Sequence, residues 1–237
     1  MIKNILIWIV ILLNFTLSAT AETLIEKEGI WYKNETNELY SGEHLVYENN
    51  KTISKSVYRD GLKNGLEFWF YPSGSVKIKL SYEDSVQQGQ EVHYHENGNR
   101  KSIIDYVDGK KHGNMISWYE NGKLLGTAPF KNGHHDGISF AWFDNGNKRA
   151  EGHFALGHQN GIEIQHYKNG NKKLVGLWKD GKLNGLETQW YKNKIKKSEI
   201  VYVDGQASKD QKFWDEDGAL LENFNINDFI KRNKFPH

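Results

Sequence analysis

LEFWFYPSGSVKIKLSYEDSVQQG, residues 66–89, is one complete copy of a pattern that recurs along the chain. Residues 162–185 repeat its plan as IEIQHYKNGNKKLVGLWKDGKLNG. Glycines mark the register, because one series recurs every 24 residues: Gly65, Gly89, Gly113, Gly137, Gly161 and Gly185. A period of this size is typical of repeat arrays. The chain is therefore predicted to be a repeat protein, with seven copies between residues 42 and 209 and a partial copy up to residue 226.

Each copy contains two turn signals. The first is an Asn-Gly pair, at residues 97–98, 121–122, 145–146 and 169–170, and the second is Asp-Gly or Asn-Gly, as at Asp108-Gly109. Asn-Gly supplies the positive φ of a tight primed hairpin turn. Two turns per copy leave two strands of roughly six to eight residues, a normal strand length. The unit is a β-hairpin, and the fold class is all-β: a single elongated, twisted antiparallel sheet that forms an open solenoid.

Aromatic residues recur at fixed places in the copies. The second strand has an aromatic column that runs from Tyr58 through Tyr82 to Tyr202, and the first strand has a pair of columns before its turn. Equal positions in successive hairpins share one face of a sheet, so these rings are predicted to form core ladders. Small residues at Ala128, Gly152 and Gly176 leave room for rings opposite them. The alternative is a partner-binding surface, for which the candidates are Trp118, Trp142, Trp190, Tyr119, Tyr167 and Tyr191.

This pattern resembles the MORN-type repeat, in its bacterial variant form with a 24-residue step. The resemblance rests on the aromatic pair, Asn-Gly, a lysine-rich strand, and Asp-Gly followed by Lys110-Lys111-His112-Gly113 or its equivalents. The entry at residues 38–50 is similar to the start of YwqK-like antitoxin-family proteins. The resemblance covers about residues 30–226. It implies a binding or scaffolding role of the antitoxin or immunity type, without catalysis.

The two ends of the chain differ from the repeats. Residues 1–21 have a basic Lys3, an apolar run from Ile5 to Leu17 and the small-x-small site Ala19-Thr20-Ala21, which is typical of a secretory signal peptide. Residues 22–41 are expected to form an N-terminal cap strand, and residues 227–237 a tail or short helix that covers the last sheet edge. We expect an exported protein, periplasmic or secreted.

The charge balance limits the partners. Removal of residues 1–21 takes away Lys3 and leaves 30 basic and 30 acidic residues. A neutral chain provides no field that would attract nucleic acid or anionic lipid. The absence of cysteine means that packing, not disulfides, must stabilise the exported chain. The expected partner is a protein, such as a toxin or an envelope component. We expect the chain to be a monomer that binds no nucleic acid and does not insert into a membrane after removal of the signal peptide.

The sequence contains no convincing catalytic, cofactor or metal site. The nucleophile elbow and the phosphate-binding loop are both absent. His93 and His95 have a spacing that metal sites use, but a third ligand is lacking. Four glutamates share one repeat position and are interpreted as a solvated face whose partners are strand lysines across the sheet. The glutamates are Glu67, Glu91, Glu163 and Glu187, and the lysines are Lys77, Lys101, Lys173 and Lys197.

Three classes of function follow from these features. The favoured one is a non-enzymatic protein-binding module or scaffold, because a solenoid offers an extended surface. The alternative is a cell-wall or glycan-binding module that uses exposed rings. An enzyme would need a cleft with converging polar groups, which the repeats do not predict.

Overall fold

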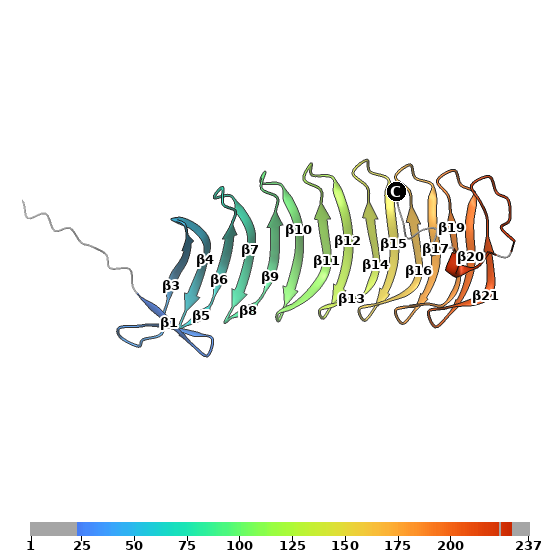
Figure 1. Ribbon diagram of the computed structural model, residues 1–237. Coiled ribbons are helices and arrows are strands. Elements are labelled where there is room, and N and C mark those ends of the chain that lie inside the picture. The colour runs from blue at the N-terminus through green and yellow to red at the C-terminus, as the bar shows by residue number, and fades with distance from the viewer. Residues whose placement is uncertain (1–22, 223, 229–237) are drawn as a thin grey trace, which may run out of the picture.

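The computed structural model describes residues 23–222 and 224–228. It contains one large antiparallel sheet in which strands follow one another in chain order, and Figure 1 shows it as a long, curved ribbon of hairpins. The first and last strands of this sheet, β3 (Gly42–Glu48) and β21 (Gln206–Phe213), lie at opposite ends and share no register pairs. The sheet is therefore open, as the repeat pattern predicted. No helix in the described part of the chain is long and apolar enough to span a bilayer.

The strands alternate between the two arms of each hairpin. In four copies the residue before the main glycine divides one arm into a two-residue strand and a six-residue strand, as Asn64 does between β5 and β6. The strands between β3 and β21 are β4 (Lys51–Arg59), β5 (Leu62–Lys63), β6 (Gly65–Phe70), β7 (Val76–Glu83), β8 (Val86–Gln87), β9 (Gly89–Tyr94), β10 (Arg100–Val107), β11 (Lys110–Trp118), β12 (Leu124–Lys131), β13 (His134–His135), β14 (Gly137–Trp142), β15 (Lys148–Ala155), β16 (His158–His166), β17 (Lys172–Lys179), β18 (Lys182–Leu183), β19 (Gly185–Trp190) and β20 (Lys196–Val203).

The Asn-Gly turns differ from the prediction of a two-residue primed turn. At residues 95–99, the Gly98 N–H donates to the His95 carbonyl at 2.9 Å and the His95 N–H donates to the Asn99 carbonyl at 2.8 Å. Only Gly98 has a positive φ, of 87°. This is a three-residue loop, in which an ordinary turn is followed by a left-handed glycine. Asn97 therefore serves through its side chain, which accepts from the Asn99 N–H at 3.0 Å.

The primed turns occur instead at the Asp-Gly pairs. Asp108 and Gly109 have φ values of 49° and 71°, and Val107 pairs with Lys110 across the turn. Both central residues are left-handed, as a type I′ turn requires. Leu156 occupies the same left-handed position in its copy, with φ of 49°. The primed turn that was predicted at the Asn-Gly pairs therefore occurs at the Asp-Gly pairs.

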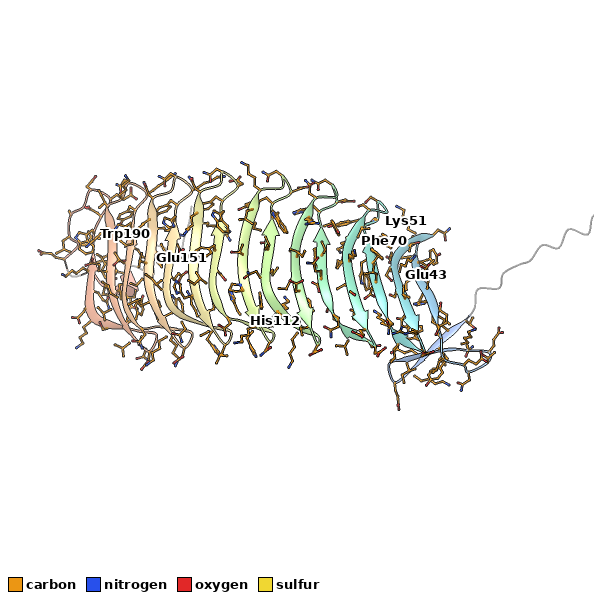
Figure 2. The ribbon with its side chains drawn as sticks, turned by 180° about the vertical axis from the view of Figure 1, so that it is seen from behind. Glu43, Lys51, Phe70, His112, Glu151 and Trp190 are labelled. Carbon is orange, nitrogen blue, oxygen red and sulfur yellow. The ribbon has the colours of Figure 1, made fainter. Side chains whose placement is uncertain are left out.

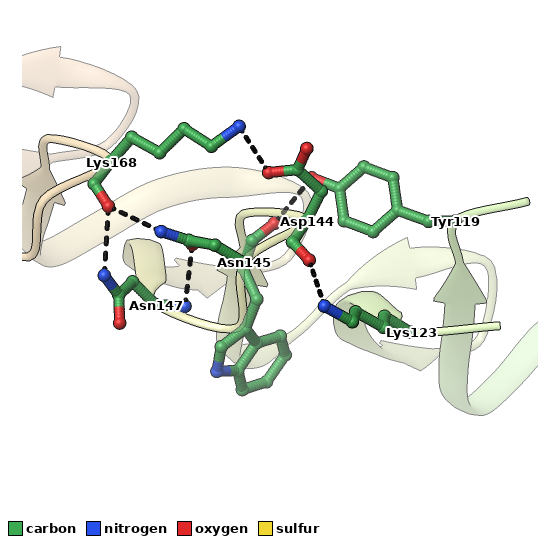
Figure 3. Close-up of polar contacts among 7 residues, drawn as sticks. Tyr119, Lys123, Asp144, Asn145, Asn147 and Lys168 are labelled. Atoms are coloured by element: carbon green, nitrogen blue, oxygen red, sulfur yellow. Dashed lines mark hydrogen bonds and ion pairs between the residues drawn. The ribbon is translucent and has the colours of Figure 1, made fainter. Parts of the chain in front are cut away.

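Backbone and side-chain hydrogen bonds join successive copies at both long edges of the sheet. At the primed turns the glycine N–H donates to a carbonyl of the preceding copy, as from Gly133 to Lys111 at 2.8 Å. At the other edge, Asn145 and Asn147 each donate from Nδ2 to the Lys168 carbonyl, at 2.9 and 3.0 Å (Figure 3). Equivalent asparagine bonds reach the carbonyls of Glu120, Lys192 and Glu216.

Tyrosines form a third link between copies. The Tyr119 hydroxyl donates to the carbonyl of Trp142 in the next copy at 2.8 Å (Figure 3). The same bond is made from Tyr71 to Tyr94, from Tyr167 to Trp190 and from Tyr191 to Trp214, and His95 reaches the Trp118 carbonyl through its ring nitrogen. Phe143 occupies the column between Tyr119 and Tyr167 and has no hydroxyl. The copy that contains it therefore lacks this link to the next one.

Both ends of the array carry a covering segment. Residues 22–41 were expected to form one cap strand, but the described part forms a separate hairpin of β1 (Leu24–Lys27) and β2 (Ile30–Lys33). At the other end, the chain folds back after β21, and Phe224 contacts Phe213 edge-on at 5.2 Å. A helical turn spans residues 226–228. The rest of the predicted tail, from residue 229, and the predicted signal peptide lie outside the described residues.

The sheet is a single layer, and side chains project from both of its faces (Figure 2). Its core is accordingly thin. The most buried apolar side chains are Ile104 at 2%, Phe213 at 1% and Ile200 at 0% exposure. Stability must therefore come from contacts along the sheet rather than from a second layer.

We predict that Tyr119→Phe lowers the free energy of unfolding by about 1 kcal/mol, because one partly buried hydrogen bond is lost. The reverse change, Phe143→Tyr, supplies a hydroxyl where the column lacks one and should raise the stability by a similar amount. Urea unfolding followed by tryptophan fluorescence measures both. Equal midpoints for the two variants and the wild type would contradict the role assigned to the tyrosine column.

Candidate functional site

The two faces of the sheet carry different chemistry. Register pairs and the alternation of side chains place residues 67, 91, 163 and 187 on one face, which we call the glutamate face. Trp118, Trp142 and Trp190 lie on the opposite face, which we call the tryptophan face. Contact between the rings of Phe140 and Trp142, at 5.9 Å, agrees with this assignment.

The structure brings the six predicted candidates together at one edge of the array. Trp118, Trp142 and Trp190 form a column near the Asn-Gly turns, and their side chains are half-buried. Tyr119, Tyr167 and Tyr191 follow them and use their hydroxyls to hold the next copy, as described above. These three tyrosines therefore link neighbouring copies of the array.

A row of exposed aliphatic residues also runs along the tryptophan face. The repeat position after the main glycine holds Leu66, Ile138 and Leu186, and Leu177 is beside them. Their exposed fractions are 39%, 43%, 46% and 43%. This row was not predicted from the sequence, although the 24-residue period would have located it. Apolar side chains that stay open to solvent along one face mark an interaction surface.

The four glutamates contradict the interpretation as a solvated face. Glu67 and Glu187 are only 3% and 6% exposed. Glu67 accepts hydrogen bonds from Ser56 at 3.1 Å and from Lys63 at 2.7 Å, both close in the hairpin. The lysines predicted as partners are elsewhere, and Lys77, for example, lies over the Tyr71 ring at 5.7 Å. A buried carboxylate needs such partners, because an unpaired buried charge is costly.

The aromatic column on the glutamate face, which includes Tyr82, Phe130 and Phe154, alternates with a second column, which includes Lys63, Lys111 and His135. Lys63 lies over the Tyr82 ring at 5.0 Å, and Lys111 lies over the Phe130 ring at 5.3 Å. His135 stacks between Phe130 and Phe154, at 5.3 and 3.8 Å. Ring faces in this column are thus covered by cations or flat polar groups of the chain itself.

In three copies the residue of this second column also contacts the side chain at the glutamate position four residues later. Lys63 pairs with Glu67, Gln87 donates to Glu91 at 2.7 Å, and the His135 ring is hydrogen-bonded to the Ser139 hydroxyl. The phenol of Tyr82 also lies next to Glu67. Burial raises the pKa of Tyr82 to about 12, and the negative charge of Glu67 acts in the same direction. The phenol therefore stays neutral and serves as a hydrogen-bond donor.

A hollow of about 310 Å³ opens on the glutamate face in the middle of the array. It forms where the repeat pattern changes, because Met115 and Ser139 replace the glutamates of the other copies. The residue that pairs with the glutamate position on the neighbouring strand is Leu80, Ile104 or Ile200 near the ends of the array. In the middle of the array this residue is small. The residues that line the hollow include Met115, Ala128, His135, Ser139, Gly152, Phe154 and Glu163.

Two carboxylates lie at the C-terminal side of the hollow. Glu163 accepts hydrogen bonds from Gln165 at 2.6 Å and from the Trp178 indole N–H at 2.8 Å. Glu187 lies one strand beyond Gly176 and accepts from Gln189 at 2.8 Å. Burial raises the pKa of Glu187, and the charge of Glu163 adds to this shift.

Histidines do not form a metal centre in the part of the chain that the structure describes, where no group of three or more potential ligands occurs. His93 is hydrogen-bonded to Glu91 at 2.6 Å, and His95 uses a ring nitrogen for the Trp118 carbonyl at 3.0 Å. Both imidazoles thus have partners in the array. Their spacing of two residues is a consequence of the repeat.

The architecture defines a class, the open repeat array of antiparallel β-hairpins, and a match to a family of repeats agrees with it. Residues 63–84, 87–108 and 111–132 match the family described as MORN repeat variant. The chain therefore contains MORN variant repeats in tandem, as the resemblance implied. No curated protein matches the sequence.

Among solved structures, alternansucrase in complex with isomaltononaose aligns with this chain at 17% identity and a TM-score of 0.20. The alignment covers 76% of this chain and 16% of that protein. A similarity this low carries no argument about fold or function.

Acid should destabilise the array through its buried imidazoles. Burial lowers the pKa of His135 below its ordinary value, so the unfolded chain takes up a proton near pH 6.5 that the folded chain resists. Stability contributed by this group is complete above about pH 6.5 and is lost as the pH falls below that value. We predict that the urea midpoint falls between about pH 7.5 and 5.5 and that His135→Gln, which installs the residue of the equivalent Gln87 and Gln159, reduces the fall.

His134→Gln is the matched control, since the His134 side chain is exposed. It should retain the wild-type pH dependence. An unchanged slope in His135→Gln would show that this imidazole does not titrate on unfolding.

Proposed function

We propose that this chain is an exported, non-enzymatic scaffold that binds a partner protein through the tryptophan face. The observation that carries the proposal is the row of exposed aliphatic side chains at Leu66, Ile138, Leu177 and Leu186. Ile138, Leu177 and Leu186 lie in three consecutive copies, whereas Gln90 and Asn114 separate them from Leu66. Repeat arrays typically bind partners over such extended surfaces. The half-buried tryptophans beside the row would supply the aromatic anchors that protein interfaces favour.

The site of action follows from the N-terminal sequence. Residues 1–21 have the form of a secretory signal peptide, and we infer that the mature chain acts in the periplasm or the medium. The resemblance to YwqK-like proteins makes an immunity-type role against a toxin delivered into the envelope the first partner class to test. A glycan-binding role would need open ring faces, and the three candidate tryptophans are half-buried.

Capture experiments with the mature chain test the proposal. The chain should retain a defined protein from the envelope fraction of its source, and Ile138→Ser combined with Leu186→Ser should weaken binding of that purified protein roughly tenfold or more. Val46→Ser is the control, because Val46 is 38% exposed but lies on the glutamate face. Retention of polysaccharide without protein would favour the glycan alternative.

Two results would overturn the proposal. One is undiminished binding by the double variant when circular dichroism shows an intact fold. The other is recovery of the native chain from the cytosol alone, which would remove the exported role.

A further inference from the structure

The carboxylates beside the hollow on the glutamate face lack the lysine partner that Glu67 has in the first part of the array. Near the first copies, the chain supplies its own cation: Lys63 pairs with Glu67 at 2.7 Å and lies over the Tyr82 ring. Around Glu163 and Glu187 the equivalent arm residues are Gln159 and Leu183, which carry no charge. Within residues 23–222 and 224–228, no ion pair involves either carboxylate.

The geometry points to a lysine side chain of a peptide or protein as the ligand of this hollow. We propose that its ammonium pairs with Glu163, as Lys63 pairs with Glu67, and that its aliphatic stem lies on Gly152 and points towards Ala128. The proposal concerns the opposite face from the tryptophan row and does not depend on the function proposed there.

The shape of the hollow fits this ligand. Gly152 lies between Ser139 and Glu163 in the sheet, where the equivalent residues near the ends are Leu80, Ile104 and Ile200. The absence of a side chain at Gly152 leaves space beside Glu163 that is bounded by the edge of the Phe154 ring. Apolar walls cover a methylene stem, whereas the carboxylate at the end selects for a positive charge.

The surroundings of Glu163 also leave its charge to be balanced from outside. Its two hydrogen-bond donors, Gln165 and Trp178, are neutral. Glu187 lies close enough to feel its charge, and its own donor, Gln189, is neutral as well. Two adjacent carboxylates without a cation favour a cationic ligand, since an opposite charge relieves the cost of their burial.

The covering segments leave this part of the face accessible. The N-terminal hairpin places Trp31 against His44 and Tyr58, at 4.8 and 5.6 Å, over the first copy. At the other end, Phe224 covers Phe213. The hollow lies between them, over β11 to β16, and neither segment contributes to its lining.

The Trp178 indole N–H reports on the site directly, because it donates to Glu163. Titration of the mature chain with Nα-acetyl-lysine methylamide should shift the Trp178 indole resonance in ¹H–¹⁵N spectra, with saturation. Glu163→Gln keeps an acceptor for the indole but removes the charge, so the apparent affinity should fall at least tenfold. The uncharged analogue Nα-acetyl-norleucine methylamide should produce no saturable shift.

A second variant tests the space rather than the charge. Gly152→Ile installs the residue that the same slot holds at Ile104 and Ile200, and the added Cβ would lie 3.1 Å from the edge of the Phe154 ring and 4.0 Å from Gln159 Nε2. It should abolish the shift in a chain that circular dichroism shows to be folded. Ala128→Ile serves the same purpose if Gly152→Ile does not fold. A lysine response that persists in Glu163→Gln, an equal response to norleucine, or no saturable response would each overturn the proposal.

Discussion

The hydrogen bond from a side chain in one copy to a backbone carbonyl in the next is the interaction on which this architecture depends. A single-layer sheet has no opposing layer, so its hairpins are joined mainly by the strand ladder and by bonds at its edges. Tyr119, Asn145 and Gly133 represent the three kinds of edge bond, and each of them reaches a different carbonyl of a neighbouring copy. Because only neighbours touch, stability is close to a sum over copies and their interfaces.

This constraint explains which positions repeat and which vary. Residues that serve the edges recur in nearly every copy, since their loss would weaken a junction. The glutamate position is under a different demand, because its partner varies between copies. Lys63 serves Glu67, Gln87 serves Glu91 and His135 serves Ser139, whereas Glu163 and Glu187 use Gln165 and Gln189 two residues later. The central copies could therefore exchange glutamate for Met115 and Ser139 without losing the sheet, and the small residues between them open the hollow.

The period, the hairpins, the open sheet and the tandem MORN variant repeats were predictable from the sequence, because glycines and rings recur at a fixed step. The turn types were not. Asn97 and Asp108 both precede glycine, and only the number of residues in each loop decides which one becomes left-handed. The burial of Glu67 also escaped prediction, since its partners Ser56 and Lys63 lie on neighbouring strands. The hollow required the register of six strands to be known.

Amide hydrogen exchange of the Asn145→Ala, Asn147→Ala double variant tests the account most directly. Both side chains hold the Lys168 carbonyl, so their loss should increase exchange in the two turns at residues 143–147 and 167–171 and in the strands next to them. Exchange at residues 71–75 and 215–218, several copies away, should remain unchanged. A uniform increase over the whole array would contradict the account, because it would mean that a shared core, rather than contacts between neighbours, holds the copies together.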